Sequence, residues 1–151
     1  MIANPFVECS SLADAQNIAG FSFYLPEDLL KGDVVYRVLN TDEKMIEIIV
    51  KDSDETITLR KSISKNDISG LYFDFKEETT ININNINITL RGFSESYVNA
   101  LWSDNTYSYS IYIPSGRDYS YFKQIVGYIC WEKPSRLRVR WKQLFFTLTI
   151  N

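Results

Sequence analysis

The sequence predicts an α+β fold: an antiparallel meander sheet of about six to eight strands, with a short N-terminal helix and a second helix packed on it. Three observations support this prediction. Ten Tyr and nine Phe among 151 residues favour strands. Apolar and polar residues alternate on both sides of three two-residue turn candidates, and two segments carry apolar residues at helical spacing.

The first hairpin has Asn84-Asn85 as its turn, because Asn tolerates the positive φ that a two-residue turn requires. This register puts apolar pairs on one face, Ile83 with Ile86 and Ile81 with Ile88. On the other face, Glu78 lies opposite Arg91 and makes an opposite-charge contact.

A second hairpin turns at Asp104-Asn105. Its register pairs Trp102 with Tyr107 and Ala100 with Tyr109, and so directs the larger aromatic residues toward the core. The opposite face receives four residues that we interpret as a candidate binding surface: Tyr97, Asn99, Ser110 and Tyr112.

A third hairpin turns at Ser53-Asp54 and places Glu47 opposite Arg60 on the solvent side. Further strands are predicted over 33–39 and 45–51. Residues 21–25 have the pattern of an edge strand that Pro26 ends.

The N-terminal helix is predicted over about residues 11–19, with Ser10 or Ser11 as its cap and Gly20 as its end. Its inward residues would be Leu12, Ala15, Ile18 and Ala19. The second helix is predicted over about 117–129, opened by a capping box in 115–118. Its apolar stripe contains Tyr119, Phe122, Ile125, Val126 and Ile129.

The composition predicts one domain over residues 1–130 and a basic aromatic tail over 131–151. The tail carries four more basic than acidic residues, which leaves −7 for residues 1–130 in a chain of net charge −3. Arg136, Arg138 and Arg140 alternate with apolar residues, so the tail is strand-like or disordered. As a strand it would pair with a sheet edge in the monomer or a dimer; its basic face would otherwise meet an anionic partner.

The polar residues of the chain favour structural roles over catalytic or metal-binding roles. The chain has no histidine, and we find no nucleophile–base pair, phosphate loop or metal-ligand spacing; we therefore expect no cofactor and no enzyme activity. We interpret 67–70 as a structural turn, with a ligand loop as the alternative, and 52–55 as a solvated hairpin tip. The two cysteines, Cys9 and Cys130, are expected to be free, with a disulfide as the alternative.

Several short segments, in order, resemble the DUF4367 family, a bacterial domain family of unknown function found mostly in Firmicutes. The similar segments include Asn4-Pro5-Phe6-Val7, Asp67-Ile68-Ser69-Gly70, Leu90-Arg91-Gly92 and Ala100-Leu101-Trp102. The resemblance covers about residues 4–129, and it implies a domain type without an established activity, cofactor or catalytic residue. Family members occur as small free-standing proteins or as the part outside the membrane of single-span proteins.

These observations predict a non-catalytic binding or interaction module, with a protein partner or a homodimer and with nucleic acid unlikely as a ligand. One alternative is a structural protein that self-associates through edge strands and the tail; another is an enzyme without a recognisable motif. We identify no signal peptide and no transmembrane segment, so we expect a soluble cytoplasmic protein, or an extracytoplasmic one if a leader was removed.

Overall fold

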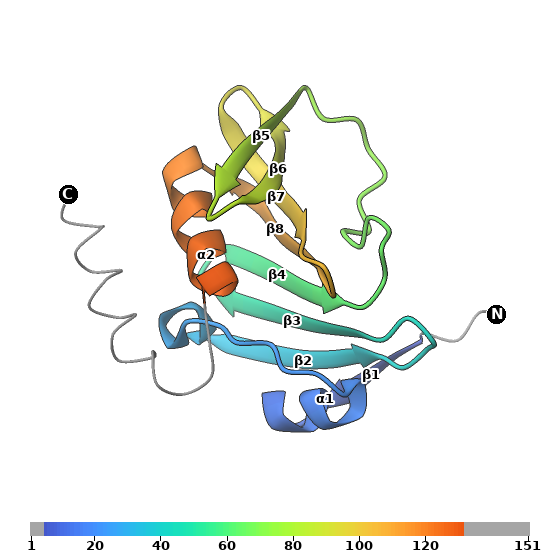
Figure 1. Ribbon diagram of the computed structural model, residues 1–151. Coiled ribbons are helices and arrows are strands. Elements are labelled where there is room, and N and C mark those ends of the chain that lie inside the picture. The colour runs from blue at the N-terminus through green and yellow to red at the C-terminus, as the bar shows by residue number, and fades with distance from the viewer. Residues whose placement is uncertain (1–4, 132–151) are drawn as a thin grey trace.

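The computed structural model describes residues 5–131, and these form an eight-stranded antiparallel sheet with two α-helices packed on it (Figure 1). The fold class is therefore α+β, as predicted. The strands are β1 Phe6–Cys9, β2 Asp33–Leu39, β3 Met45–Asp52, β4 Glu55–Ser62, β5 Glu77–Ile83, β6 Ile86–Phe93, β7 Ser96–Ser103 and β8 Ser108–Arg117. The helices are α1 Leu12–Ala19, the 3₁₀ turn η1 Glu27–Leu30 and α2 Tyr119–Trp131.

The sheet order is β1-β2-β3-β4-β8-β7-β6-β5. The first four strands follow the chain, and residues 63–76 then cross to the far edge, where β5 begins (Figure 1). The chain returns through β6 and β7 to β8, which pairs with β4 and so joins the two halves.

The structure confirms the registers of two predicted hairpins. Ile83 pairs with Ile86 across a turn in which Asn84 and Asn85 have φ of 51° and 68°. At the third hairpin, Glu47 pairs with Arg60 as predicted. Two-residue turns define these registers because they leave one geometry for the flanking strands.

The predicted register of the β7–β8 hairpin is wrong by two residues. Trp102 pairs with Tyr109 rather than Tyr107, because the connection spans four residues. The Asp104 side chain accepts hydrogen bonds from the Thr106 and Tyr107 amides at 2.7 and 2.6 Å, and the Asp104 amide donates to the Tyr107 carbonyl at 2.9 Å. From Asn99 to Ser103, a shift of two residues keeps the side chains on their predicted faces. A bulge between Tyr97 and Asn99 then changes the register, so that Tyr97 pairs with Arg117.

Helix α1 begins and ends as predicted: the Ser11 side chain accepts from the Asp14 amide, and Gly20 follows the helix with φ of 85°. Ile18, predicted to face inward, is exposed. The predicted strand at 21–25 is wrong. This segment instead inserts Phe23 into the core, and the Phe23 amide donates to the Gln16 side chain at 2.8 Å.

Helix α2 begins two residues later than predicted because β8 continues to Arg117. Asp118 caps it by accepting from the Tyr121 amide at 3.0 Å, so the predicted capping box in 115–118, which would begin at Ser115, is wrong. Tyr119 is exposed, whereas Phe122 and Val126 are fully buried.

Both helices and the 21–25 segment pack on one face of the sheet, which we call the core face. The core there contains Ala15 of α1, Phe23, Phe122 of α2, Ile48 and Ile111. The opposite face, called the second face below, contains the side chains of alternate strand residues, including Glu47, Arg60 and Asn99.

Candidate functional site

The second face contains a buried carboxylate, Glu47, that is only 1% exposed. It lies between Arg37 of β2 and Arg60 of β4 in one cross-strand row. The Nε atoms of Arg37 and Arg60 donate to its two oxygens at 2.7 and 2.8 Å. The prediction that Glu47 faces solvent is therefore wrong, because neighbouring groups cover it and its charge is balanced by two cations.

Two segments cover the cluster of Arg37, Glu47 and Arg60: strand β1, through Phe6, and the turn at 67–70. The guanidinium of Arg37 lies 4.6 Å from the centre of the Phe6 ring. Arg60 Nη1 donates to the carbonyl of Ile68 at 2.8 Å, in the turn at 67–70. A Cβ on Gly70 would lie 2.8 Å from Arg60 Nη1, and Gly70 has φ of 72°, so glycine allows the close approach.

Hydrogen bonds and an ion pair hold the turn at 67–70 in place. The Ser69 amide donates to the Asp67 carboxylate at 2.8 Å, and Arg91 Nη2 lies 2.9 Å from the other oxygen. Burial acts to raise the pKa of Asp67, but hydrogen bonds from Ser69 and Arg91 outweigh it and hold that pKa below its ordinary value.

The predicted binding residues do not form one accessible surface. Asn99 and Ser110 are 0% and 2% exposed, whereas Tyr97 and Tyr112 are half-buried. The Asn99 amide nitrogen donates to Ser110 Oγ at 3.2 Å and to the Ile111 carbonyl at 2.8 Å. These two polar residues thus join β7 to β8 beneath the surface. The other predicted residues, Arg136, Arg138 and Arg140, lie outside the described residues, as does the predicted tail strand.

An aromatic surface, not predicted above, follows the turn. Tyr72 is 98% exposed and Phe73 is 46% exposed. The Phe73 ring lies 4.6 Å from that of Phe75 and 6.4 Å from that of Phe93, measured between ring centres. We call these four residues the aromatic patch. Three aromatic residues within four positions, between two predicted strands, were the sequence signal that could have revealed it.

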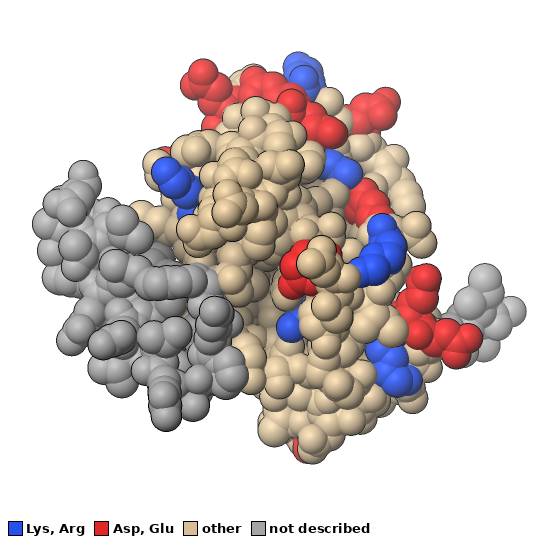
Figure 2. Space-filling view, viewed as in Figure 1, with Lys and Arg blue, Asp and Glu red and all other residues tan. Residues whose placement is uncertain are grey.

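Acidic side chains lie near this patch. Asp74 lies within the segment, and β5 begins with Glu77 and Glu78. Glu77 accepts a hydrogen bond from the amide of Glu95 in the β6–β7 turn at 3.0 Å. Figure 2 shows acidic side chains gathered at the top of the view, where Figure 1 places the start of β5 and the β6–β7 turn. Exposed Lys76 lies among these carboxylates, so the border carries a net negative charge.

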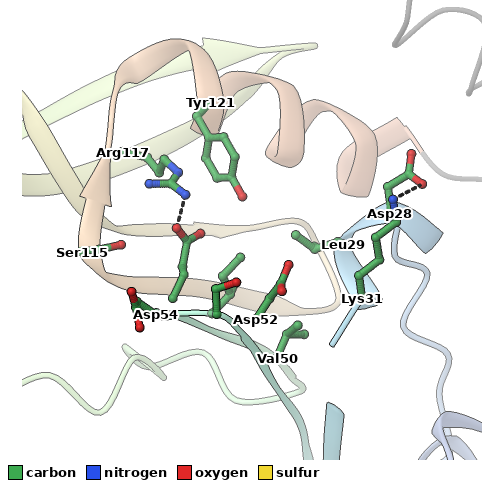
Figure 3. Close-up of a pocket in the computed structure, with 12 residues that line it drawn as sticks. Asp28, Leu29, Lys31, Val50, Asp52, Asp54, Ser115, Arg117 and Tyr121 are labelled. Atoms are coloured by element: carbon green, nitrogen blue, oxygen red, sulfur yellow. Dashed lines mark hydrogen bonds and ion pairs between the residues drawn. The ribbon is translucent and has the colours of Figure 1, made fainter. Parts of the chain in front are cut away.

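A pocket of about 490 Å³ lies at the tip of the β3–β4 hairpin, beside η1 and the start of α2 (Figure 3). Arg117 pairs with Glu55, and Lys31 lies 3.8 Å from Asp28. The Tyr121 ring centre is 5.1 Å from the Arg117 guanidinium, and burial followed by the Glu55 charge raises the pKa of Tyr121. The Glu55–Arg117 pair joins the hairpin to β8, and the contact of Arg117 with Tyr121 extends this connection to α2, so these charged residues have structural roles. Lys31 and Asp28 pair with each other at η1.

The core face buries a charged side chain, Lys61. Lys61 is 8% exposed, and its Nζ donates to the Ser22 carbonyl at 2.5 Å and lies 4.2 Å from the centre of the Tyr107 ring. Burial lowers the pKa of Lys61. Burial also raises the pKa of Tyr109 and raises that of Cys130 to about 12, so both stay protonated at neutral pH. Cys9 and Cys130 are free thiols, as expected.

No family model, curated protein or solved structure matches the chain, so the resemblance to DUF4367 stays a prediction. Within residues 5–131, no group of three or more Cys, Asp or Glu side chains is arranged to hold a metal ion. Over the same range, no helix combines the length and the apolar character that crossing a bilayer requires.

Proposed function

We propose that this domain is a non-catalytic interaction module that binds a protein partner through the aromatic patch. The observation that carries the proposal is the 98% exposure of Tyr72 beside the half-exposed Phe73. Large aromatic side chains supply much of the binding energy at protein interfaces, and burying such a ring in a partner is strongly favourable.

Three of the four rings of the patch, Phe73, Phe75 and Phe93, contact one another before any partner binds. Its Phe75 ring lies 5.4 Å from the guanidinium of Arg91, which also pairs with Asp67 at the base of the segment. Phe75 and Phe93 are 5.9 Å apart between ring centres. A surface anchored in this way loses little conformational entropy on binding, which favours affinity.

The acidic border indicates the partner's chemistry. An apolar pocket surrounded by Lys and Arg would accept the aromatic rings and complement Asp74 and Glu77. A non-catalytic role is supported by the charged groups of the second face, because Glu47, Arg37 and Arg60 are engaged with each other.

The test begins with a photo-cross-linking amino acid in place of Tyr72, in cells of the organism that encodes the chain. A protein captured there is purified and its affinity is measured against the wild type and the double variant Tyr72→Ala, Phe73→Ala. We expect the double variant to bind at least about tenfold more weakly, since hot-spot aromatics each contribute about 2 kcal/mol or more.

Tyr119→Ala provides the matched control, because Tyr119 is an exposed tyrosine on α2, away from the patch. It should bind as the wild type does. Equal affinity of the double variant and the wild type would overturn the proposal, as would the absence of any cross-linked protein from position 72.

A further inference from the structure

The edge of the sheet at β5 is open. Within residues 5–131, β5 pairs only with β6. Its seven residues contain no Pro and no Lys, and its charges are confined to Glu77 and Glu78 at its start. Edge strands are usually short, charged or covered, because their unpaired backbone groups attract other strands. The opposite edge, β1, has only four residues and follows this rule.

The hairpin geometry identifies the unpaired backbone groups of β5. Ile83 and Ile86 flank a two-residue turn, so they form a hydrogen-bonded pair. Alternate residues point their amide and carbonyl groups the other way. Glu78, Thr80 and Asn82 therefore present these groups at the open edge.

The two sides of β5 differ in polarity. Ile81 and Ile83 pack against the core but remain only half-buried, which leaves apolar surface at the edge. Glu78, Thr80 and Asn82 are exposed on the opposite side. A complementary strand needs apolar residues on one side and basic residues on the other.

We propose that residues 137–142 of the same chain add to β5 as an antiparallel ninth strand. They lie outside the described residues, and their sequence matches the edge in one register. On the core side the pairs are Ile83 with Leu137, Ile81 with Val139 and Thr79 with Trp141. On the second face the pairs are Asn82 with Arg138, Thr80 with Arg140 and Glu78 with Lys142. In this register Glu78 lies directly opposite Lys142 and diagonally across from Arg140, so it is near two cations.

The position of α2 favours pairing within one chain. A Cβ on Gly127 would lie 3.9 Å from Ile83 Cγ2, so the helix passes beside the end of β5. The helix ends four residues later, about 6 Å further along its axis. The five residues 132–136 can span up to about 16 Å, which is enough to bring Leu137 to Ile83 and to direct the chain back along β5.

The test is a cross-link in the full chain with Cys9→Ser and Cys130→Ser as background. Ile81→Cys and Val139→Cys face each other in a non-hydrogen-bonded pair, the closest cross-strand geometry. Under oxidised glutathione we expect a disulfide within one chain. The matched control, Thr80→Cys with Val139→Cys, places the two thiols on opposite faces and should not cross-link.

A disulfide that joins two chains, or none within a chain, would overturn the proposal. A second measurement covers misfolding of the cysteine variants: amide hydrogen exchange in the wild-type chain. We expect the amides of Thr80 and Asn82 to exchange at least about tenfold more slowly than unprotected amides. Exchange at unprotected rates would also overturn the proposal, and neither result depends on the aromatic patch.

Discussion

The two faces of the sheet are both partly buried, but by different kinds of side chain. The core face packs Ile48, Ile111 and Phe122 beneath α1 and α2. The second face buries Glu47 and Asn99, and residues 63–76, which cross to the far edge of the sheet, contact Arg60 on this face. Apolar burial is non-directional, whereas each buried polar group needs a partner in the right place.

This difference teaches how each face tolerates change. A core residue loses stability in proportion to the volume and contacts removed. Removal of Glu47 leaves two arginines without the carboxylate that pairs them. The core face also buries a charged residue, Lys61, among its apolar side chains. Replacing Lys61 with an apolar residue tests whether its charge stabilises or destabilises the fold.

The largest effect is expected for Phe122→Ala on the core face. Phe122 is fully buried, so the variant leaves a cavity between α2 and the sheet and should lose about 4 kcal/mol of unfolding free energy. Urea unfolding measures the loss. Tyr119→Ala on the same helix is the control and should change it by less than about 0.5 kcal/mol. A loss below about 1 kcal/mol for Phe122→Ala would contradict this packing.

Glu47→Ala should follow, with a loss of about 3 kcal/mol, because Arg37 and Arg60 then face each other without a counter-ion. Glu8→Ala is the matched control, since Glu8 also lies opposite Arg37 but is exposed. Its loss should stay below about 0.5 kcal/mol. If the two variants had equal stability in urea unfolding, Glu47 would not be the buried centre of this face.

Lys61→Met should give the smallest change and the opposite sign, a gain of about 1 kcal/mol at pH 7. Burial lowers the folded-state pKa below 10.5, so the folded state binds fewer protons than the unfolded state. The penalty is full below the folded-state pKa and falls to zero as pH rises from that pKa to the unfolded-state pKa.

The gain from Lys61→Met should therefore shrink between pH 7 and pH 10, which urea unfolding at both values measures. Exposed Lys123→Met is the control and should change stability little at either pH. A destabilised Lys61→Met at pH 7 would show that the bond to the Ser22 carbonyl and the ring contacts outweigh the burial cost.

Local patterns predicted much of the fold. Asn84-Asn85 determined the β5–β6 register, and Ser11 with Gly20 determined the ends of α1, because these depend on residues adjacent in the chain. Between β7 and β8 a four-residue loop forms in place of the predicted two-residue turn, because the Asp104 side chain accepts hydrogen bonds from amides within that loop. The faces survived that error because side chains alternate with period two.

The candidate site was less predictable. The alternation assigned Glu47, Asn99 and Ser110 to the second face correctly, but it could not show that other segments cover that face. Coverage depends on contacts between residues far apart in the chain, such as Arg60 with Ile68 and Arg91 with Asp67. The exposure of Tyr72 also depends on tertiary contacts, because they decide where residues 63–76 lie over the sheet.

The sequence by itself determined the class of the fold, the polarity of each strand face and the local turns, because these follow from short-range sterics and side-chain period. Only the tertiary structure decided that β8 joins β4, that Glu47 is buried between two arginines and that the aromatic patch is exposed. Those features depend on packing between distant segments, whose energy local sequence patterns do not contain.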